Sequence, residues 1–223
     1  MTIKGILWDM DGVLVDTNEF HYQAWSRTLA LFQIPFSREL FHQGFGMKNW
    51  DMLTNLLGHP PEQALFTEIN DQKEENFRQI IHRQARSLPG TVESLRLLKS
   101  LGLPQAIASS APQQNIDILV DELEIRDFFD AILSADNMAG KPAPDVFLAS
   151  AKAIGIPPQD CLAVEDSVMG VSAAKLAGMT CLAVTNTNPV EALHQADYVV
   201  DNLLQLDMVF WKTLTGMKNE PSV

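Results

Sequence analysis

The sequence lacks the features that mark a membrane-spanning, secreted or disulfide-bonded protein. Its apolar stretches are only a handful of residues long, far short of the roughly 20 residues that a transmembrane helix needs. Asp9 and Asp11 interrupt the first apolar run before the core of a signal peptide could form. Cys161 and Cys181 stand alone in apolar surroundings, without the paired spacing of a metal site. We therefore expect a cytoplasmic protein with no disulfide, no zinc and no membrane partner.

Positive charge is also scarce. Lysine and arginine total 16 residues against 28 aspartates and glutamates, which gives a formal net charge of −12. Nucleic acids and anionic membrane surfaces demand basic patches, so this balance argues against both as partners. The same balance makes an anionic ligand difficult to bind. Any phosphate site in this chain would need a local cation to reverse the field.

The rest of the composition is that of an ordinary globular protein, with 46% hydrophobic and 20% charged residues in a chain of 223. Short apolar, β-rich runs recur, and helical patterns lie between most of them from Leu88 onward. Three of these helical patterns close on Gly102, Gly155 and Gly178, where left-handed helix C-caps are expected. The alternation predicts an α/β fold, a Rossmann-like parallel sheet with helices on both faces. The expected strands are 3–8, 105–108, 131–133, 161–164, 180–184 and 198–200.

Residues 17–87 do not follow this alternation. Their apolar residues recur at helical spacing, as at His21, Trp25 and Leu29, and no convincing strand stands among them. Pro89-Gly90 then marks the return to the sheet. We predict an inserted all-helical cap domain over 17–87 and a catalytic core made of 1–16 and 88–223.

Distinctive polar residues follow four of the expected strands. Because the carboxyl ends of parallel strands form the ligand-binding edge of an open α/β sheet, these residues are expected to converge there. Each signal alone is weak, since a turn, a helix cap or a surface lysine would explain it. Their joint placement and order make coincidence a poor explanation. The residues are Asp9 and Asp11, Ser109 and Ser110, Lys141, and Glu165 and Asp166.

The residue types indicate phosphoryl transfer. Packed carboxylates repel one another unless a cation neutralises them, and oxygen ligands without histidine or cysteine favour Mg²⁺. Asp9 can bind that metal with one oxygen and attack phosphorus with the other, which forms an aspartyl-phosphate. Asp11 can protonate the leaving oxygen and later deprotonate water. Ser109, with nearby backbone N–H groups, can hold the phosphoryl oxygens, and Lys141 can stabilise their charge.

These motifs resemble those of the haloacid dehalogenase superfamily over essentially the whole chain. The first motif matches Asp9-Met10-Asp11-Gly12-Val13, the second Ser109, the third Lys141, and the fourth Glu165-Asp166. The resemblance implies that Asp9 is the nucleophile and Asp11 the acid/base. It also implies that the metal is held by Asp9, Glu165, Asp166 and the main-chain carbonyl of Asp11. A helical cap after the first motif belongs to the same resemblance.

Within the superfamily, Asp11 argues against dehalogenases and phosphonate hydrolases, because neither has an aspartate there. The chain looks most like the branch of β-phosphoglucomutases and sugar-phosphate phosphatases. His21, Trp25 and Lys73 resemble the mutase. Asn49, with Lys48 beside it, stands where the mutase has an arginine that grips the substrate's second phosphate. The segment 109–112 looks more like the phosphatases.

Several cap residues have two interpretations. His21 and Trp25 could form the buried face of a helix, or His21 could help to position Asp11. Lys73 could be a solvated lysine or, with Lys48 and Asn49, a substrate-binding group. The loop 44–50, which contains Phe45, Met47 and Trp50, could be cap core or a substrate-facing lip. With Ser109, Ser110 and Lys141, the residues His21, Lys48, Asn49 and Lys73 form the predicted substrate-binding set.

The sequence thus favours a Mg²⁺-dependent phosphatase for a small phosphorylated metabolite, with a sugar phosphate preferred, acting as a monomer or weak homodimer. A hexose-phosphate mutase is the alternative. A third hypothesis is a non-catalytic phospho-acceptor module, against which the intact Asp11 speaks.

Overall fold

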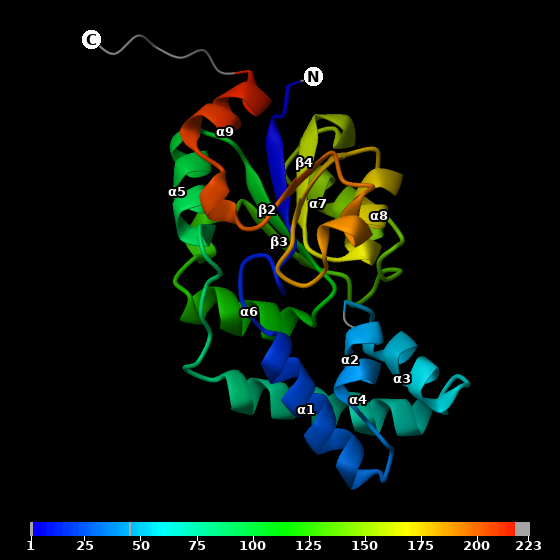
Figure 1. Cartoon of the computed structure of the whole chain (residues 1–223). Helices are drawn as coiled ribbons and strands as arrows, with labels where there is room; N and C mark the ends of the chain where they lie inside the picture. The colour runs from blue at the N-terminus through cyan, green and yellow to red at the C-terminus, as the bar shows by residue number, and fades with distance from the viewer. Residues whose placement is uncertain (1, 45, 217–223) are drawn as a thin grey trace.

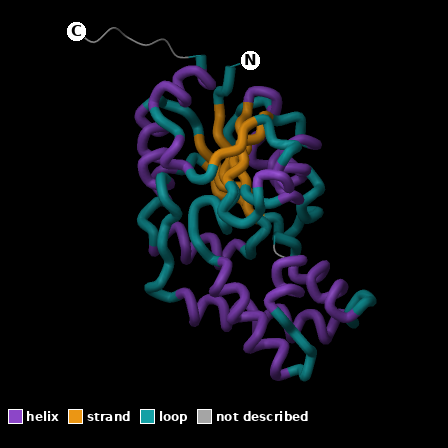
Figure 2. The backbone as a smooth tube through the Cα atoms, viewed as in Figure 1, coloured by secondary structure: helices purple, strands orange, loops and turns teal. Residues whose placement is uncertain are grey.

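A computed structural model describes residues 2–44 and 46–216. The strands of this part of the chain form one parallel six-stranded sheet in the order β3-β2-β1-β4-β5-β6 (Figure 2). This sheet confirms the predicted α/β fold. The limits of β5 and β6 are those expected, and those of the other four strands differ by one or two residues. The strands are β1 (Gly5–Trp8), β2 (Gln105–Ser109), β3 (Ala131–Ser134), β4 (Cys161–Glu165), β5 (Thr180–Val184) and β6 (Tyr198–Val200).

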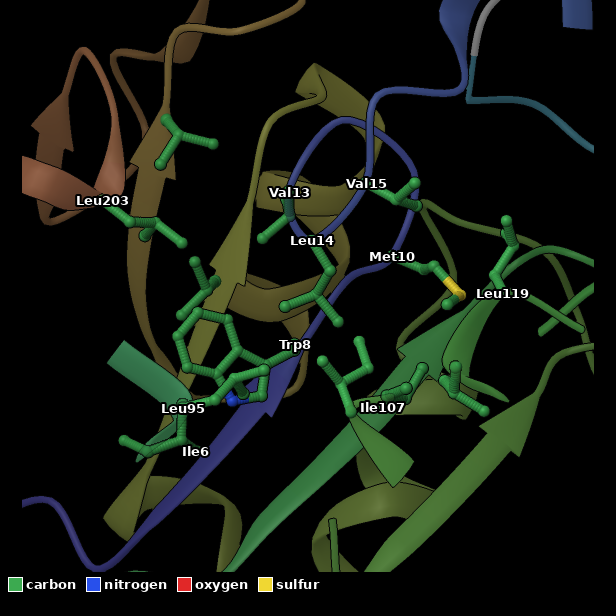
Figure 3. Packing of buried hydrophobic residues seen from close by; sticks show 14 of the residues in the cluster. Ile6, Trp8, Met10, Val13, Leu14, Val15, Leu95, Ile107, Leu119 and Leu203 are labelled. Atoms are coloured by element: carbon green, nitrogen blue, oxygen red, sulfur yellow. The ribbon is translucent and has the colours of Figure 1, made fainter. Parts of the chain in front are cut away.

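Helices cover both faces of the sheet (Figure 1). Successive strand residues point to opposite faces, so Ile6 and Trp8 of β1 belong to one apolar cluster and Leu7 to the other. The first cluster, part of which is seen in Figure 3, includes Leu95 and Leu119 from the helices on that face. The helices of that face are α5 (Thr91–Ser100), α6 (Gln113–Glu122) and α9 (Met208–Thr215), and those of the other face are α7 (Asp145–Ala153) and α8 (Val168–Leu176).

Short 3₁₀ turns and left-handed glycines complete the connections. Gly102, Gly155 and Gly178 have φ angles of 71°, 70° and 76°, which confirms the left-handed conformation expected at these helix ends. The 3₁₀ turns are η1 (Arg126–Phe128), η2 (Pro158–Asp160), η3 (Val190–Leu193) and η4 (Leu203–Gln205).

Four helices between β1 and α5 lie apart from the sheet, beyond the carboxyl end of β1 (Figure 1). They share an apolar cluster of their own, built on Trp25, Phe41, Leu53 and Ile69. The predicted cap limits, 17–87, stay a prediction. The helices are α1 (Asn18–Leu31), α2 (Arg38–Gly44), α3 (Asn49–Leu57) and α4 (Gln63–Ile81).

The cap helices are also fixed to the core. The end of α4 packs against the core. Its residues Phe77, Ile80 and Ile81 belong to the apolar cluster that contains Ile6 and Trp8, not to the cap cluster. None of the described helices combines the length and apolar character needed to cross a membrane.

The central strands β1 and β4 are neighbours, paired from Gly5 with Cys161 to Trp8 with Val164. Their carboxyl ends therefore lie side by side and face the cap.

Candidate active site

The loop after β1 is tightly wound. The carbonyl of Met10 accepts the N–H groups of Val13, Leu14 and Val15, so the chain turns at once after Asp9. Gly12 has a φ of 83°, and a Cβ at this position would overlap the Asp166 carboxylate. Glycine is therefore required for the loop of β1 to pass so close to the end of β4.

Three buried carboxylates meet at this junction. Oxygens of Asp9, Glu165 and Asp166 lie within 4.8 Å of one another. Burial raises the pKa of Asp9 to about 8, with Lys141 opposing and Glu165 adding to the rise. The pKa of Asp166 lies well above its ordinary value, first because of burial and then because of the neighbouring carboxylates. The cluster therefore carries more negative charge than its surroundings compensate.

Lys141 is the cation within this cluster. Its ammonium donates to Asp9 Oδ1 and, at 2.5 Å, to Glu165 Oε1. Burial alone would lower the pKa of Lys141, but the charges of Asp9 and Glu165 outweigh it and raise that pKa. Lys141 therefore stays charged, as a residue that stabilises a transferring phosphoryl group must be.

Glu165 is held more completely than the two aspartates. Its Oε2 accepts the backbone N–H groups of Asp166 and Ser167 at 3.1 and 3.2 Å and the Ser167 hydroxyl at 3.1 Å. A Cβ at Gly170 would overlap its carboxylate, so glycine makes room for it in α8. Glu165 thus orients Lys141 from a fixed position.

The donor set fits a hard divalent cation. All three groups offer carboxylate oxygens, they lie close enough to share one ion, and carboxylates packed together repel one another unless a cation neutralises them. Asp9, Glu165 and Asp166 are the side chains that could hold Mg²⁺.

The loop after β5 contributes residues that the sequence reasoning missed. Thr187 donates its hydroxyl to Asp166 Oδ2, and Asn188 donates to the Asp166 carbonyl at 3.0 Å. Asn186 donates to the Gly12 carbonyl at 2.9 Å. Thr-Asn-Thr-Asn directly follows a buried strand, so the strand-end rule that identified the other motifs applies to it as well.

Asp11 turns away from the acidic cluster and toward the cap. Its Oδ1 accepts the Thr17 hydroxyl at 2.5 Å and lies 3.4 Å from His21 Nε2. Burial alone would raise the pKa of Asp11, but the hydrogen bonds and charge of His21, with Thr17, outweigh it and lower that pKa. The acid/base role of Asp11 and the role of its carbonyl in metal binding both stay predictions.

His21 and Trp25 satisfy both interpretations made from the sequence. Trp25 is buried in the cap cluster, and the His21 ring stacks on Phe77 with centroids 4.0 Å apart. Both also line a cavity of about 400 Å³ between the acidic cluster and the cap. Burial, followed by the charge of Lys73, lowers the pKa of His21.

Lys73 is not the solvated lysine of the first interpretation. It is 3% exposed, and its ammonium lies 2.7 Å from Glu74 Oε1 and 3.1 Å from His21 Nδ1. Asn49 donates to the same Glu74 oxygen at 2.6 Å and to Asn70 at 2.9 Å. Lys73 and Asn49, two of the four cap residues predicted to bind substrate, are thus joined through Glu74, which the sequence reasoning did not single out.

Lys48 reaches across to the core instead of pointing only into the cavity. Its ammonium donates to the carbonyls of Ala135 and Met138, each at 2.6 Å. Its side chain also passes over Gly140, where a Cβ would come within 2.9 Å of it. Lys48 thus bonds the loop that leads to Lys141, and its predicted contact with substrate stays a prediction.

The two serines after β2 face different surroundings. Ser109 is 1% exposed, and its Oγ accepts the Ala111 N–H at 3.0 Å. Ser110 lines the cavity, and its buried Oγ has no hydrogen-bond partner among the described residues. Ser110 is therefore the better placed of the two hydroxyls to meet a ligand as the site stands.

The cap side of the cavity is largely apolar and aromatic. Met47 and Trp50 both line it, which favours the interpretation of these two residues as a substrate-facing lip. The predicted loop 44–50 is shorter than expected, because α3 already begins at Asn49 and includes Trp50. Phe45 lies outside the described residues. The other apolar side chains of this wall are Trp25, Phe41, Met52 and Phe66.

Comparisons with known proteins agree with this geometry. A family model described as haloacid dehalogenase-like hydrolase matches residues 3–178. The chain is 32% identical over 196 residues to a β-phosphoglucomutase of Bacillus subtilis, covering 84% of this chain and 86% of that protein. It is 29% identical over 208 residues to a phosphorylated carbohydrates phosphatase of Thermotoga maritima, with coverages of 88% and 93%.

Comparison with solved structures also finds a β-phosphoglucomutase. The crystal structure of a β-phosphoglucomutase from Clostridium difficile superposes with a TM-score of 0.86 at 26% identity. The superposition covers 96% of this chain and 98% of that protein. Sheet, helices and cap are therefore shared along nearly the full described chain.

Proposed function

Because the chain belongs to the haloacid dehalogenase-like hydrolases, we propose that it is a Mg²⁺-dependent phosphatase of small phosphorylated metabolites, with Asp9 as nucleophile. One observation carries the proposal: Asp9, Glu165 and Asp166 lie within 4.8 Å of one another beside a charged Lys141, at the floor of a cavity. This arrangement suits a phosphoryl group better than a neutral ligand, since it supplies a nucleophile, a cation and metal ligands at one point.

The chemistry divides between the core residues. Asp9 attacks phosphorus, the bond to the leaving oxygen breaks, and Asp11 delivers the proton that this oxygen takes. Water then attacks the aspartyl-phosphate while Asp11 takes its proton, which releases inorganic phosphate and restores Asp9. Lys141 balances the charge of the transferring group. Bound Mg²⁺ would supply further positive charge at Asp9, Glu165 and Asp166.

A mutase is the second candidate, because β-phosphoglucomutases stand among the relatives. A mutase must hold a bisphosphate by both ends, and an arginine fork is the best clamp for the far phosphate. Asn49 is neutral, and its amide is already bonded to Asn70 and Glu74. These contacts support water, rather than a second sugar hydroxyl, as the acceptor of the phosphoryl group.

We also propose a substrate class, a cellular location and an oligomeric state. The substrate we propose is a sugar phosphate, in keeping with the name of the Thermotoga relative and with a cavity that combines aromatic faces with amides. We further propose a cytoplasmic protein that acts as a monomer or weak homodimer. Its net charge of −12 supports the proposal that neither nucleic acid nor an anionic membrane is a partner.

A phosphate-release screen over a panel of phosphorylated metabolites tests the proposal. Hydrolysis should disappear with a chelator and return with Mg²⁺, whereas Ca²⁺, which is larger and less strictly octahedral, should support it poorly. Full activity in excess chelator would contradict the metal site. Stoichiometric labelling of Asp9 without turnover would instead favour a phospho-acceptor module.

A coupled dehydrogenase assay distinguishes the mutase. β-Glucose 1-phosphate with a bisphosphate primer should give little glucose 6-phosphate, while a sugar phosphate of the panel releases inorganic phosphate. Formation of glucose 6-phosphate faster than phosphate release would reverse the order of the two candidates.

A further inference from the structure

Glu74 is a buried charged group of the cap that the proposed mechanism does not use. It lies on α4, is 4% exposed and contributes to the lining of the cavity. Its Oε1 accepts from Lys73 at 2.7 Å and from Asn49 at 2.6 Å, and its Oε2 accepts from Asn115 of α6 at 2.5 Å. One carboxylate therefore holds Lys73 and Asn49, two of the four cap residues that the sequence predicts for substrate binding, and ties them to the core.

This contact changes what Lys73 can do. Its ammonium is enclosed by the Glu74 carboxylate, His21 and the rings of Trp25 and Phe77, which lie 5.6 and 5.5 Å away. The lysine and the glutamate cancel in net charge. A second phosphate at this wall would have to displace Glu74 from Lys73 and would then lie beside a buried carboxylate of its own sign.

The other cations that line the cavity are also engaged. Lys48 donates to two main-chain carbonyls of the core, and Lys141 donates to Asp9 and Glu165 at the floor. The same cavity is lined by Asn70, whose amide oxygen accepts from Asn49, and by the aromatic residues Trp50 and Phe66. Amides and aromatic faces suit the hydroxyls and C–H faces of an uncharged sugar or polyol.

We propose that Glu74 is a specificity-determining residue that restricts the enzyme to phosphate monoesters whose leaving group has no second anionic group. The proposal rests on the phosphatase function and names its substrate class. Glu74 acts by neutralising Lys73 and by holding Asn49. Removal of its charge frees one lysine for a second phosphate.

Competition against p-nitrophenyl phosphate hydrolysis at constant excess Mg²⁺ tests this. The inhibition constants of glucose 6-phosphate and glucose 1,6-bisphosphate are compared, so neither sugar needs to be a good substrate. The wild-type protein should bind the bisphosphate no more tightly than the monophosphate. Glu74→Gln should lower the constant of the bisphosphate about tenfold relative to that of the monophosphate, the effect of one charge-assisted hydrogen bond.

Two control variants separate this role from charge and packing in general. Glu75→Gln removes the neighbouring exposed charge of α4 and should leave the ratio of the two constants unchanged. Asn115→Ala breaks the bond of Glu74 to the core without freeing Lys73, so both constants should move together. A change of the ratio in either control would overturn the proposal.

Lys73→Met provides a second route if Glu74→Gln folds poorly. It leaves Glu74 without its cation, so it should weaken binding of the bisphosphate more than that of the monophosphate. An unchanged ratio in a folded Glu74→Gln or in Lys73→Met overturns the inference alone. A wild-type protein that releases no phosphate from p-nitrophenyl phosphate contradicts the proposed function itself.

Discussion

The two sides of the cavity treat their carboxylates in opposite ways. On the core side, Asp9, Glu165 and Asp166 share one lysine, and burial and mutual repulsion raise the pKa values of both aspartates. On the cap side, burial alone would raise the pKa of Glu74, but the charges of Lys73 and His21 outweigh it and lower that pKa to about 2.

The contrast indicates on which side of the cavity the carboxylates still lack compensating charge. On the core side, three carboxylates face one lysine, and a bound cation can compensate the remaining negative charge. This side can therefore still bind a cation. The cap carboxylate has three donors and a full counter-charge, so its polar groups are mutually satisfied. In the proposed function, the core provides the chemistry and the cap selects among leaving groups.

The largest effect is expected from a change that removes the core nucleophile. Asp9→Asn should abolish phosphate release and any trapped phospho-enzyme, because an amide cannot attack phosphorus. In chelator above about pH 8, where Asp9 is ionised, the same change should also raise thermal stability, since one buried like charge is gone. Asp145→Asn, which alters an exposed aspartate of α7, should keep full activity. Turnover in Asp9→Asn would assign the nucleophile to another residue.

A smaller loss is expected at Asp11, the core carboxylate that faces the cap. Asp11→Asn keeps the nucleophile but removes the proton donor and base, so turnover should fall by about 10²–10⁴-fold. The loss should be greater for an alkyl phosphate than for p-nitrophenyl phosphate, whose leaving oxygen needs no proton. Equal losses for both substrates would mean that Asp11 only supports the structure through Thr17 and His21.

Substitution of Lys48, which joins the cap to the core, tests whether the two sides of the cavity act independently. Lys48→Met removes the bonds to the carbonyls of Ala135 and Met138, and kcat/KM should fall about tenfold for all substrates alike. Hydrogen exchange in residues 135–141 should become faster, because this loop loses its contact with the cap. Lys152→Met, at an exposed lysine of α7, is the matched control. A loss confined to one substrate would make Lys48 a substrate ligand instead.

The smallest effect is a pH dependence of stability with opposite signs on the two sides. In chelator, Asp9 has its pKa raised from 3.8 to about 8, so its contribution to stability is full below about pH 4 and is lost as the pH rises toward 8. Glu74 has its pKa lowered from 4.5 to about 2, so its contribution is full above about pH 4.5 and is lost as the pH falls toward 2.

Denaturant unfolding across both pH windows measures this difference. Asp9→Asn should flatten the profile of the free energy of unfolding in the upper window only, and Glu74→Gln should flatten it in the lower window only. Across its window, each change in the free energy of unfolding should amount to at least about 1 kcal/mol, the order of one pKa unit. Identical profiles for the two variants would remove the distinction between core and cap carboxylates.

Local sequence signals were sufficient for the core. The strands are short apolar runs, and the glycines after α5, α7 and α8 end their helices as expected, because both features depend on neighbouring residues alone. The family resemblance is confirmed by the match over residues 3–178. Asp9, Glu165, Asp166 and Lys141 converge because strand order and a parallel sheet leave few other places for strand-end residues.

The cap contacts could not be predicted in the same way. Lys73 and Glu74 are adjacent in a mixed polar stretch, and helical periodicity does not show that both would be buried at a seam between two units. The partners of Lys48 are main-chain carbonyls, which have no signature in the sequence. Such contacts depend on how the cap sits on the core, which is a tertiary property.

The central pairing of β1 with β4 also has a consequence for the order of folding. Asp9 emerges early in synthesis, whereas Glu165 and Asp166 follow more than 150 residues later. Asp9 therefore exists long before the cluster that it joins, and the repulsion among the three carboxylates arises only when β4 docks against β1. A contact of such long range forms slowly, and a divalent cation that binds only the docked state favours this last step.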